Sequence, residues 1–175
     1  KGVKLALFDR DTNGLQNTRH LLAGESEIYV LDITNEAEVA ESINKVNDHF
    51  GRIDILVNCA GIVGKTNILS HEVEADNMQL VLNVNLMGSF YTSKYAIPKM
   101  LKNNYGRVLH IASISGKEGN AGMLAYSTSK AAVIGMTKVQ GKEYAETGVT
   151  INALAHAVIR TAMVEALPAE QVKYM

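Results

Sequence analysis

Tyr126 and Lys130 lie four residues apart in a segment with helical spacing, and Ser113 stands thirteen residues before Tyr126. Residues four apart in a helix share a face. An ammonium group beside a phenol stabilises the phenolate, so we expect Lys130 to lower the pKa of Tyr126 toward neutrality. Such a phenol could exchange a proton with a carbonyl or an alcohol during reduction or oxidation. The ordinary alternative for Tyr126 and Lys130 is an exposed side-chain pair.

Ser113 follows the apolar segment 107–112, which has the composition of a strand. Its hydroxyl could hydrogen-bond the substrate oxygen next to Tyr126. A hydroxyl that only stabilises the turn after the strand is the alternative. The combination of Ser113, Tyr126 and Lys130 carries more weight than any of the three residues alone.

Segments of strand composition alternate with segments of helical periodicity along the whole chain. The predicted strands are 3–8, 27–31, 53–57, 107–112 and 149–154, and the predicted helices are 36–50, 75–103 and 124–146. Asn35 and Glu38 have the spacing of a capping box, Gly51 follows the first helix, and Pro98 is expected to bend or end the second. Strands joined through helices are parallel, so we predict an α/β fold with a doubly wound parallel sheet, buried strands and helices on both faces.

Ligands of such sheets bind beyond the carboxyl ends of the strands, which makes the polar residues there candidates for binding. Asp9 could accept the two hydroxyls of an adenosine ribose and repel the extra phosphate of NADP, although Arg10 beside it could accept a phosphate. Asp9 could instead build a turn or cap a helix. Asp32 could bind an adenine edge or cap the following helix.

The segment Asn58-Cys59-Ala60-Gly61 follows the third predicted strand. Small residues at a strand end let a flat cofactor approach the backbone, but they also make tight turns. We expect Cys59 to be a buried small apolar residue, because no motif places a base beside it. The sequence also shows no metal-ligand spacing among its histidines.

Composition narrows the classes of partner. The chain has 175 residues, 47% of them hydrophobic, which predicts a single domain over residues 1–175. A formal net charge of −1 gives no electrostatic attraction to nucleic acid or an anionic membrane, so a small-molecule partner is expected. No apolar run reaches the length of a membrane span, and a single cysteine suits a reducing compartment, which points to the cytoplasm.

Taken together, the motifs resemble the classical short-chain dehydrogenase/reductase family. The residues that carry this resemblance stand in the family's order and spacing over nearly the entire chain: Asp32, Asn58-x-Ala60-Gly61, Asn83-Val84-Asn85-Leu86, Ser113, Tyr126-x-x-x-Lys130 and Ile159-x-Thr161. The resemblance implies a Rossmann-type sheet, a nicotinamide cofactor, and a homodimer or homotetramer built through the two long helices.

The resemblance also assigns roles to individual residues. It makes Tyr126 the general acid/base, Ser113 the residue that positions the substrate oxygen, and Lys130 a residue that lowers the Tyr126 pKa and holds the nicotinamide ribose. Asn85 would support a water in the proton relay, although an ordinary helix polar group satisfied by neighbouring backbone is the alternative. Asp9 would signal NAD rather than NADP. The cofactor-binding positions implied are Asp9, Asp32, Asn58, Ala60, Gly61, Tyr126, Lys130, Ile159 and Thr161.

Four features depart from the family pattern. The family's segment Thr-Gly-x-x-x-Gly-x-Gly is absent before the first predicted strand, and Met175 falls before the last strand expected. We therefore expect a sheet that is incomplete at both ends and a chain that is part of a longer protein. His156-Ala157 replaces the common Pro-Gly, and Cys59 replaces the second Asn of Asn-Asn-Ala-Gly.

The expected function is NAD-linked oxidation or reduction of a secondary alcohol or its ketone. The general pattern is similar to sugar-acid or polyol dehydrogenases and to 3-oxoacyl carrier-protein reductases, and Asp9 favours the first group through its preference for NAD. A different class of function, a non-catalytic dinucleotide-fold protein used for assembly or regulation, stays open because the glycine turn is missing.

Overall fold

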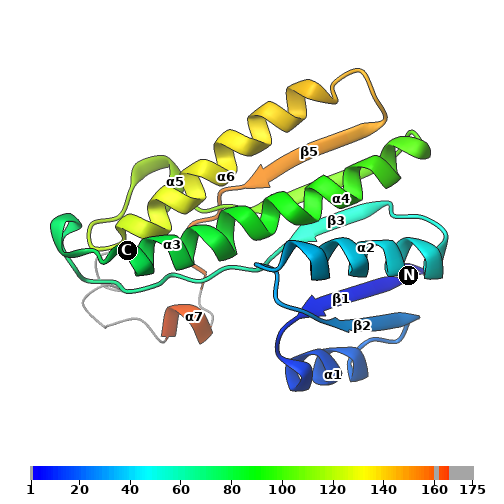
Figure 1. The fold of residues 1–175 in the computed structure, drawn as a ribbon, viewed down its shortest axis with the longest axis horizontal. Helices are drawn as coiled ribbons and strands as arrows, with labels where there is room; N and C mark the ends of the chain where they lie inside the picture. Colours follow the sequence, from blue (N-terminus) through cyan, green and yellow to red (C-terminus); the bar gives the residue numbers. More distant parts are fainter. Residues whose placement is uncertain (1, 160–161, 166–175) are drawn as a thin grey trace.

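The computed structural model describes residues 2–159 and 162–165. These residues form five strands: β1 (Leu5–Asp9), β2 (Ser26–Val30), β3 (Ile55–Asn58), β4 (Gly106–Ile111) and β5 (Val149–Leu154). β1 pairs with β2, and β4 lies between β3 and β5, with parallel pairing throughout. The predicted α/β fold with parallel strands is therefore confirmed (Figure 1).

Helices connect these strands as the crossovers require. They are α1 (Thr12–His20), α2 (Glu36–Phe50), α3 (Ala75–Leu82), α4 (Gly88–Lys102), α5 (Ser115–Glu118), α6 (Leu124–Glu143) and α7 (Ala162–Glu165). Figure 1 shows β1 and β2 lying between α2 and α1, so this strand pair has a helix on each side. In the described residues no helix has the length and hydropathy needed to cross a membrane.

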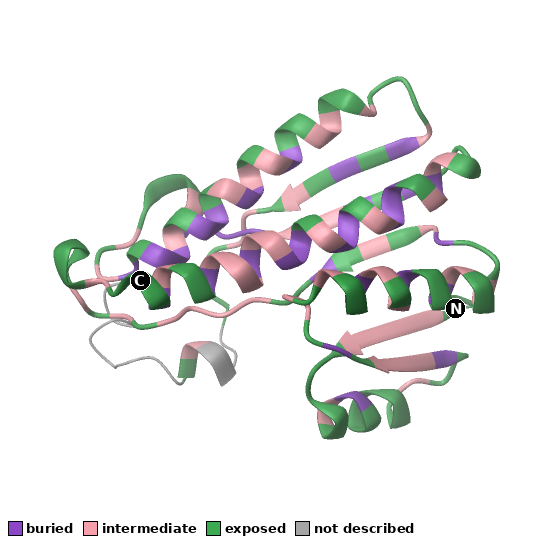
Figure 2. Ribbon diagram, viewed as in Figure 1, coloured by how far each residue is buried: buried purple, intermediate pink, exposed green. Residues whose placement is uncertain are grey.

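The core lies between the strands and the helices α2, α4 and α6. Val39, Ile43, Met100, Val108 and Ile151 are among its buried members. The expectation that the strands would be buried on both faces is wrong for β3 to β5, because burial alternates along them. Figure 2 shows this alternation on β5, where a strand covered on one face leaves every second side chain outside.

The sequence signals at the ends of α2 act as predicted. Asn35 is the N-cap, and its side-chain oxygen accepts from the Ala37 backbone N–H at 3.1 Å. Glu38 accepts from the Asn35 side-chain amide at 2.8 Å and from the Asp32 backbone N–H at 3.0 Å. Gly51 ends the helix with φ of 80°, a conformation that favours glycine.

The long helical segment predicted over 75–103 contains an irregularity that the sequence did not reveal. α3 passes into a π-helical turn at Asn83–Met87 and then into α4. Turns of this kind are rare and occur frequently at functional sites. Pro98 lies inside α4, which continues to Lys102, so Pro98 does not end the helix. The short α1 was not predicted, because Leu15 is its only buried residue.

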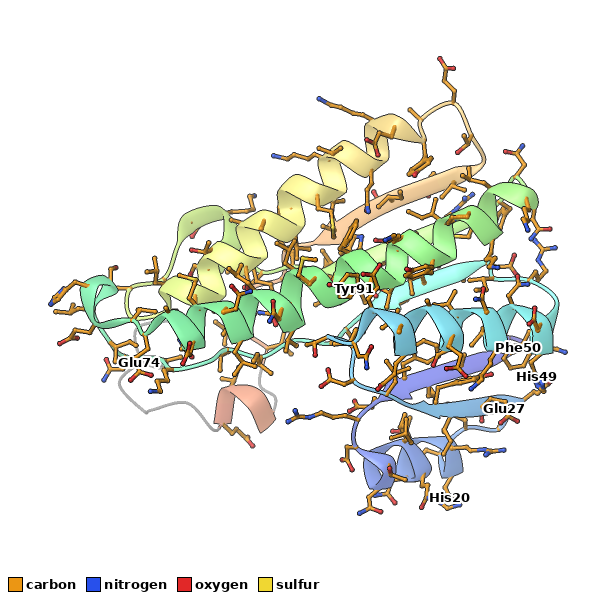
Figure 3. The ribbon with its side chains drawn as sticks, viewed as in Figure 1. His20, Glu27, His49, Phe50, Glu74 and Tyr91 are labelled. Carbon is orange, nitrogen blue, oxygen red and sulfur yellow. The ribbon has the colours of Figure 1, made fainter. Side chains whose placement is uncertain are left out.

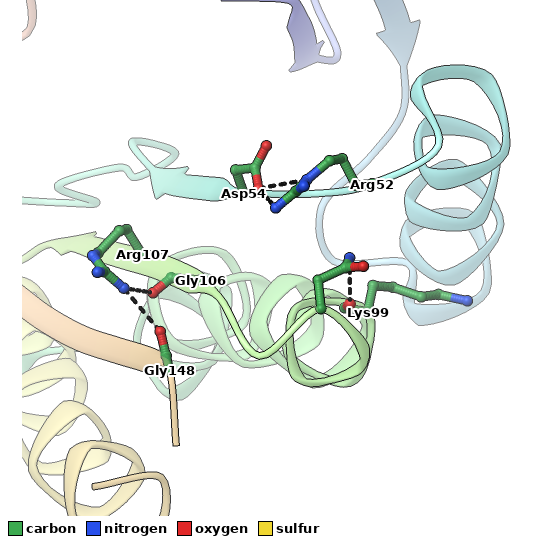
Figure 4. A network of polar contacts seen from close by, with 7 residues as sticks. Arg52, Asp54, Lys99, Gly106, Arg107 and Gly148 are labelled. Atoms are coloured by element: carbon green, nitrogen blue, oxygen red, sulfur yellow. Dashed lines mark hydrogen bonds and ion pairs between the residues drawn. The ribbon is translucent and has the colours of Figure 1, made fainter. Parts of the chain in front are cut away.

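The amino ends of the strands are held by exposed polar contacts. Arg107 donates to the carbonyl oxygens of Gly106 and Gly148, which joins the beginnings of β4 and β5 (Figure 4). Arg52 pairs with Asp54 just before β3. His49 and Phe50 stack edge to face at the end of α2 (Figure 3). These contacts lie at the opposite end of the strands from the residues that the sequence marks for chemistry.

Candidate active site

Tyr126 and Lys130 lie one turn apart near the beginning of α6, and both are buried, with 8% and 5% of their surface exposed. The alternative of an exposed side-chain pair is therefore wrong. The Lys130 ammonium donates to the carbonyl oxygen of Ile111 at 2.7 Å, and its Nζ lies 5.7 Å from the centre of the Tyr126 ring. The last residue of β4 thus holds the ammonium beside the phenol.

Ser113 lies just beyond β4 and faces the same place. It is buried, and its Oγ accepts from the Ser115 backbone N–H at 3.2 Å. The neighbouring backbone stays paired to the segment after β5, since Ala112 N–H donates to Leu154 O and Ile114 N–H donates to His156 O. This pairing fixes the turn that carries the hydroxyl.

Burial sets the pKa values of this group of residues. Burial raises the pKa of Tyr126, and a hydrogen bond from Ser113 opposes that rise. The expected lowering of the Tyr126 pKa toward neutrality is therefore wrong, because the loss of water around the phenol outweighs the opposing effect. Burial lowers the pKa of Lys130 to about 8, while the nearby Cys59 raises it. The same dry surroundings therefore shift the two pKa values in opposite directions, so that the pKa of Lys130 lies below that of Tyr126.

Asn85 is the buried residue of the π-helical turn. Its side-chain oxygen accepts from the Ile62 backbone N–H at 2.8 Å, and its amide donates to Ile62 O and to Ser129 Oγ, each at 2.9 Å. This amide pairs with backbone, as the ordinary alternative required, but the backbone belongs to the turn after β3. Asn85 thereby fixes that turn against α6.

These side chains meet at one cavity of about 410 Å³ beyond the carboxyl ends of β3, β4 and β5. Ser113, Tyr126 and Lys130 line it together with Gly61. A Cβ on Gly61 would lie 3.3 Å from Asn85 Oδ1 and 3.4 Å from Lys130 Nζ. The absence of a side chain at this position leaves the space beside the ammonium open.

Cys59 does not occupy the place that the sequence suggested. It is exposed and lines the cavity, so the expectation of a buried apolar residue is wrong. The reason is the alternation at the end of β3. Asn58 points into the core with 5% of its surface exposed, which leaves the next residue at the open edge of the sheet.

The Asn58 side chain belongs to a buried hydrogen-bonded network rather than to the cavity wall. Its oxygen accepts from Thr92 Oγ1 at 2.7 Å, and its amide lies 3.0 Å from His110 Nδ1. Since the amide can only donate, His110 accepts at Nδ1 and carries its proton on Nε2, which faces Gln140 Oε1 at 3.3 Å. The side-chain contacts of Asn58 join β3 to β4 and α4, and His110 extends the network to α6.

This network predicts a loss of stability in mild acid. Burial lowers the pKa of His110 from 6.5, so the folded state takes up its proton at lower pH than the unfolded chain does. The free energy of unfolding is then expected to fall as pH drops below 6.5, by at most about 1.4 kcal/mol per pH unit. Urea titrations between pH 5 and 7.5 measure this slope.

The matched variants for this measurement are His110→Gln and His20→Gln. The first should remove the acid-dependent loss, whatever it does to stability at neutral pH. The second replaces an exposed histidine and should leave the loss in place. An unchanged slope in His110→Gln would show that other groups cause the acid sensitivity.

Asp9 and Asp32 lie at the carboxyl ends of the other strand pair. Asp9 is exposed and accepts from the Asp11 backbone N–H at 3.0 Å, while Asp11 caps α1. Asp32 accepts twice from Thr34, and these hydrogen bonds lower its pKa. The turn-forming alternative is thus realised for Asp9, whereas Asp32 accepts from the turn before α2 and the cap of that helix is Asn35. Within the described residues, the second carboxylate oxygen of Asp9 accepts no hydrogen bond.

Ile159 lines the cavity, whereas Thr161 lies outside the described residues. Sequence reasoning missed several other wall residues. They include Val63, Ser115, Met123, Leu154 and His156. Their position was the available signal, because each of them ends a strand, follows a strand or precedes the helix that carries Tyr126.

Comparisons with known proteins agree with this geometry. The family model for short chain dehydrogenases matches residues 1–172. The chain therefore belongs to the short-chain dehydrogenase family. Its parallel sheet, the serine after β4 and the Tyr126 and Lys130 pair on α6 occupy the places that the resemblance required.

Individual relatives span two activities. A 2-dehydro-3-deoxy-L-rhamnonate dehydrogenase (NAD(+)) from Sphingomonas sp. (strain SKA58) is 40% identical over 175 residues, which is 100% of this chain and 70% of that protein. A 3-oxoacyl-acyl-carrier-protein reductase from Thermotoga maritima is 40% identical over 147 residues, covering 84% of this chain and 59% of that protein.

The fold of the chain is also close to that of a solved enzyme. The crystal structure of NAD+-bound xylitol dehydrogenase superposes with a TM-score of 0.86 at 31% identity. The superposition covers 90% of this chain and 61% of that one. The chain thus spans about three fifths to seven tenths of the length of these relatives.

Proposed function

We propose that this chain belongs to an NAD-dependent oxidoreductase that transfers a hydride between a nicotinamide cofactor and a secondary alcohol or its ketone. The observation that carries the proposal is the meeting of Ser113, Tyr126 and Lys130 at one cavity beyond the carboxyl ends of the strands. Asn85 braces the turn on the other side of Lys130. Ser113, Tyr126 and Lys130 are all buried, and all three line the same cavity.

The cavity fits a flat cofactor ring. Gly61 keeps the space beside Lys130 open. The Lys130 ammonium donates one hydrogen bond to Ile111, and its other N–H groups can donate to ribose hydroxyls. The residues that would hold the cofactor are Gly61, Lys130 and Ile159 at the cavity, with Tyr126 beside the ribose. When bound, the nicotinamide supplies or accepts the hydride.

The protein's own contribution is a proton and its position. Tyr126 donates its phenolic proton to the carbonyl oxygen during reduction and recovers it from the alcohol during oxidation. Ser113 holds the same oxygen by a hydrogen bond. Lys130 stabilises the phenolate electrostatically, because a cation in a dry cavity acts strongly on an anion nearby. We also propose that Asn85 supports a water molecule in the relay that returns a proton to Tyr126.

Asp9 carries the proposed preference for NAD. A carboxylate at the end of β1 can accept ribose hydroxyls but repels a ribose phosphate. We expect the protein to bind NADH at least about tenfold more tightly than NADPH, and Asp9→Ala to reduce this preference to about threefold or less. Fluorescence titration with each nucleotide measures the ratio. Asp11→Ala is the control, because Asp11 caps α1 from the same turn.

This titration also separates the two classes of function. It should be run on this chain and on a form extended by any natural flanking sequence. Binding of either nucleotide supports the enzyme, whereas no binding by either form would overturn it and favour an assembly or regulatory protein. Tighter binding of NADPH by the parent protein would overturn the NAD preference alone.

For the substrate we propose a sugar acid or a polyol, or the ketone formed from one. The support is the sugar-acid dehydrogenase relative, the likeness to xylitol dehydrogenase and the carboxylate of Asp9. The alternative is a 3-oxoacyl carrier-protein reductase, which the Thermotoga relative supports. Comparison of kcat/KM for a 3-deoxy-2-keto sugar acid and for a 3-oxoacyl thioester decides between them.

We further propose a homodimer or homotetramer in the cytoplasm. The two long helices α4 and α6 lie side by side in Figure 1 and carry exposed apolar side chains. These side chains are Phe90 on α4 and Leu124 and Val139 on α6. Apolar side chains on neighbouring helices favour association with a second copy. Light scattering after size-exclusion chromatography measures the mass, and a monomer at micromolar concentration would contradict this assembly.

A further inference from the structure

Ser115 places a second hydroxyl in the wall of the cavity, two residues after Ser113. It begins α5, it is 2% exposed, and it lines the cavity. Its backbone N–H donates to Ser113 Oγ at 3.2 Å, so the two serines belong to one rigid turn. Any substrate oxygen held by Ser113 therefore lies close to Ser115.

The hydrogen bonds of the Ser115 side chain leave its proton unused. Its Oγ accepts from the Asn120 side-chain amide at 2.9 Å. In the part of the chain that the structure describes, the same Oγ donates to no group. The Ser115 hydroxyl is buried, already accepts one hydrogen bond and still has a proton to donate. Such a hydroxyl needs an oxygen or nitrogen atom as acceptor.

Among the described residues that line the cavity, none accepts a hydrogen bond from Ser115 Oγ. Much of the remaining wall is apolar, formed by residues such as Val63, Ile114, Met123 and Leu154. The acceptor must then come with the molecule that occupies the cavity. Because Ser113 and Tyr126 already take the reacting oxygen, the acceptor is a different oxygen of that molecule.

Asn120 contacts both the Ser115 hydroxyl and the helix α6. Its side chain bonds Ser115, and its backbone N–H donates to Ser127 Oγ at 3.2 Å. Ser127 directly follows Tyr126 on α6. Asn120 thus links the turn that carries both serines to the helix that carries the general acid, and it acts on Ser115 as a positioning residue.

We propose that Ser115 is a specificity-determining residue that donates a hydrogen bond to a second substrate oxygen, on the carbon next to the reacting carbonyl. This inference rests on the proposed oxidoreductase function and narrows its substrates to oxygen-bearing ketones and alcohols. An α-hydroxyketone or a 2-keto acid meets the requirement, and a simple ketone does not.

The test compares an α-hydroxyketone with the matched ketone that lacks the hydroxyl, using the parent protein and Ser115→Ala. The ratio of the two kcat/KM values is expected to favour the hydroxyketone in the parent protein and to fall about tenfold in Ser115→Ala. Ser115→Thr keeps a hydroxyl and should restore most of the ratio. Ser93→Ala removes a buried hydroxyl that bonds to the Ser89 carbonyl of its own helix and does not line the cavity, and it should leave the ratio unchanged.

The outcomes separate this inference from the proposed function. An equal fall for both ketones in Ser115→Ala would assign Ser115 a structural role in the turn and overturn the inference, while the oxidoreductase function would stand. Absence of turnover of every ketone by the parent protein, with both nucleotides, would overturn the proposed function and this inference with it.

Discussion

Replacing Tyr126 with Phe is expected to lower kcat by about 10³-fold while leaving the fold and cofactor binding intact. The ring fills the same space near the beginning of α6, where the side chain is 8% exposed, so packing is retained. Only the phenolic hydroxyl is lost, and with it the hydrogen bond with Ser113. Stopped-flow and steady-state measurements of nicotinamide absorbance report the rate.

The matched control is Tyr105→Phe, which removes the same atom from a tyrosine that is 40% exposed outside the cavity. That variant should keep the parent kcat. A Tyr126→Phe enzyme with more than about a tenth of the parent rate would exclude Tyr126 as the general acid.

Because burial raises the Tyr126 pKa, the parent rate of oxidation should also rise with pH as the phenol ionises.

Replacing Lys130 with Met is expected to remove activity and increase stability at the same time. Activity should fall at least about 10²-fold, since the phenolate loses its neighbouring cation and the ribose loses its donor. Stability should rise because a buried ammonium is replaced by an apolar chain of similar length. Opposite effects on activity and stability are typical of a residue retained for function.

The gain in stability should depend on pH in a defined window. The folded pKa of Lys130 is lowered to about 8 from 10.5 in the unfolded chain, so between these values the unfolded state binds more protons. The parent protein therefore gains stability as pH rises from 8 to 10.5. Near neutral pH, the free energy of unfolding of Lys130→Met should exceed that of the parent by about 2 kcal/mol, a figure that allows for the lost hydrogen bond to Ile111. The difference should shrink as pH rises through this window.

Urea unfolding at pH 7, 9 and 10.5 measures the difference between the two proteins. Lys138→Met is the control, because Lys138 lies two turns later on the same helix and is exposed. It should change neither the rate nor the pH dependence. A Lys130→Met protein that is less stable than the parent at neutral pH would show that the ammonium stabilises the fold, contrary to this account.

The sequence alone determined the class of fold and pointed to the residues that we propose carry the chemistry. Alternation of apolar strands with amphipathic helices requires crossovers, and the spacing from Ser113 through Tyr126 to Lys130 is local information within two neighbouring elements. Local capping signals also fixed the ends of α2 at Asn35 and Gly51. Each of these features depends on residues close together in the chain, which is why a pattern could reveal them.

Only the tertiary structure decided how those residues are surrounded. The exposure of Cys59, the network from Asn58 through His110 to Gln140, and the contact of Asn85 with Ile62 all join segments far apart in the chain. The pKa values follow the same rule. The sequence predicted that Lys130 would set the pKa of Tyr126, but desolvation by the packed elements acts on both groups and shifts both. Burial is a property of the assembled fold, and no spacing along the chain encodes it directly.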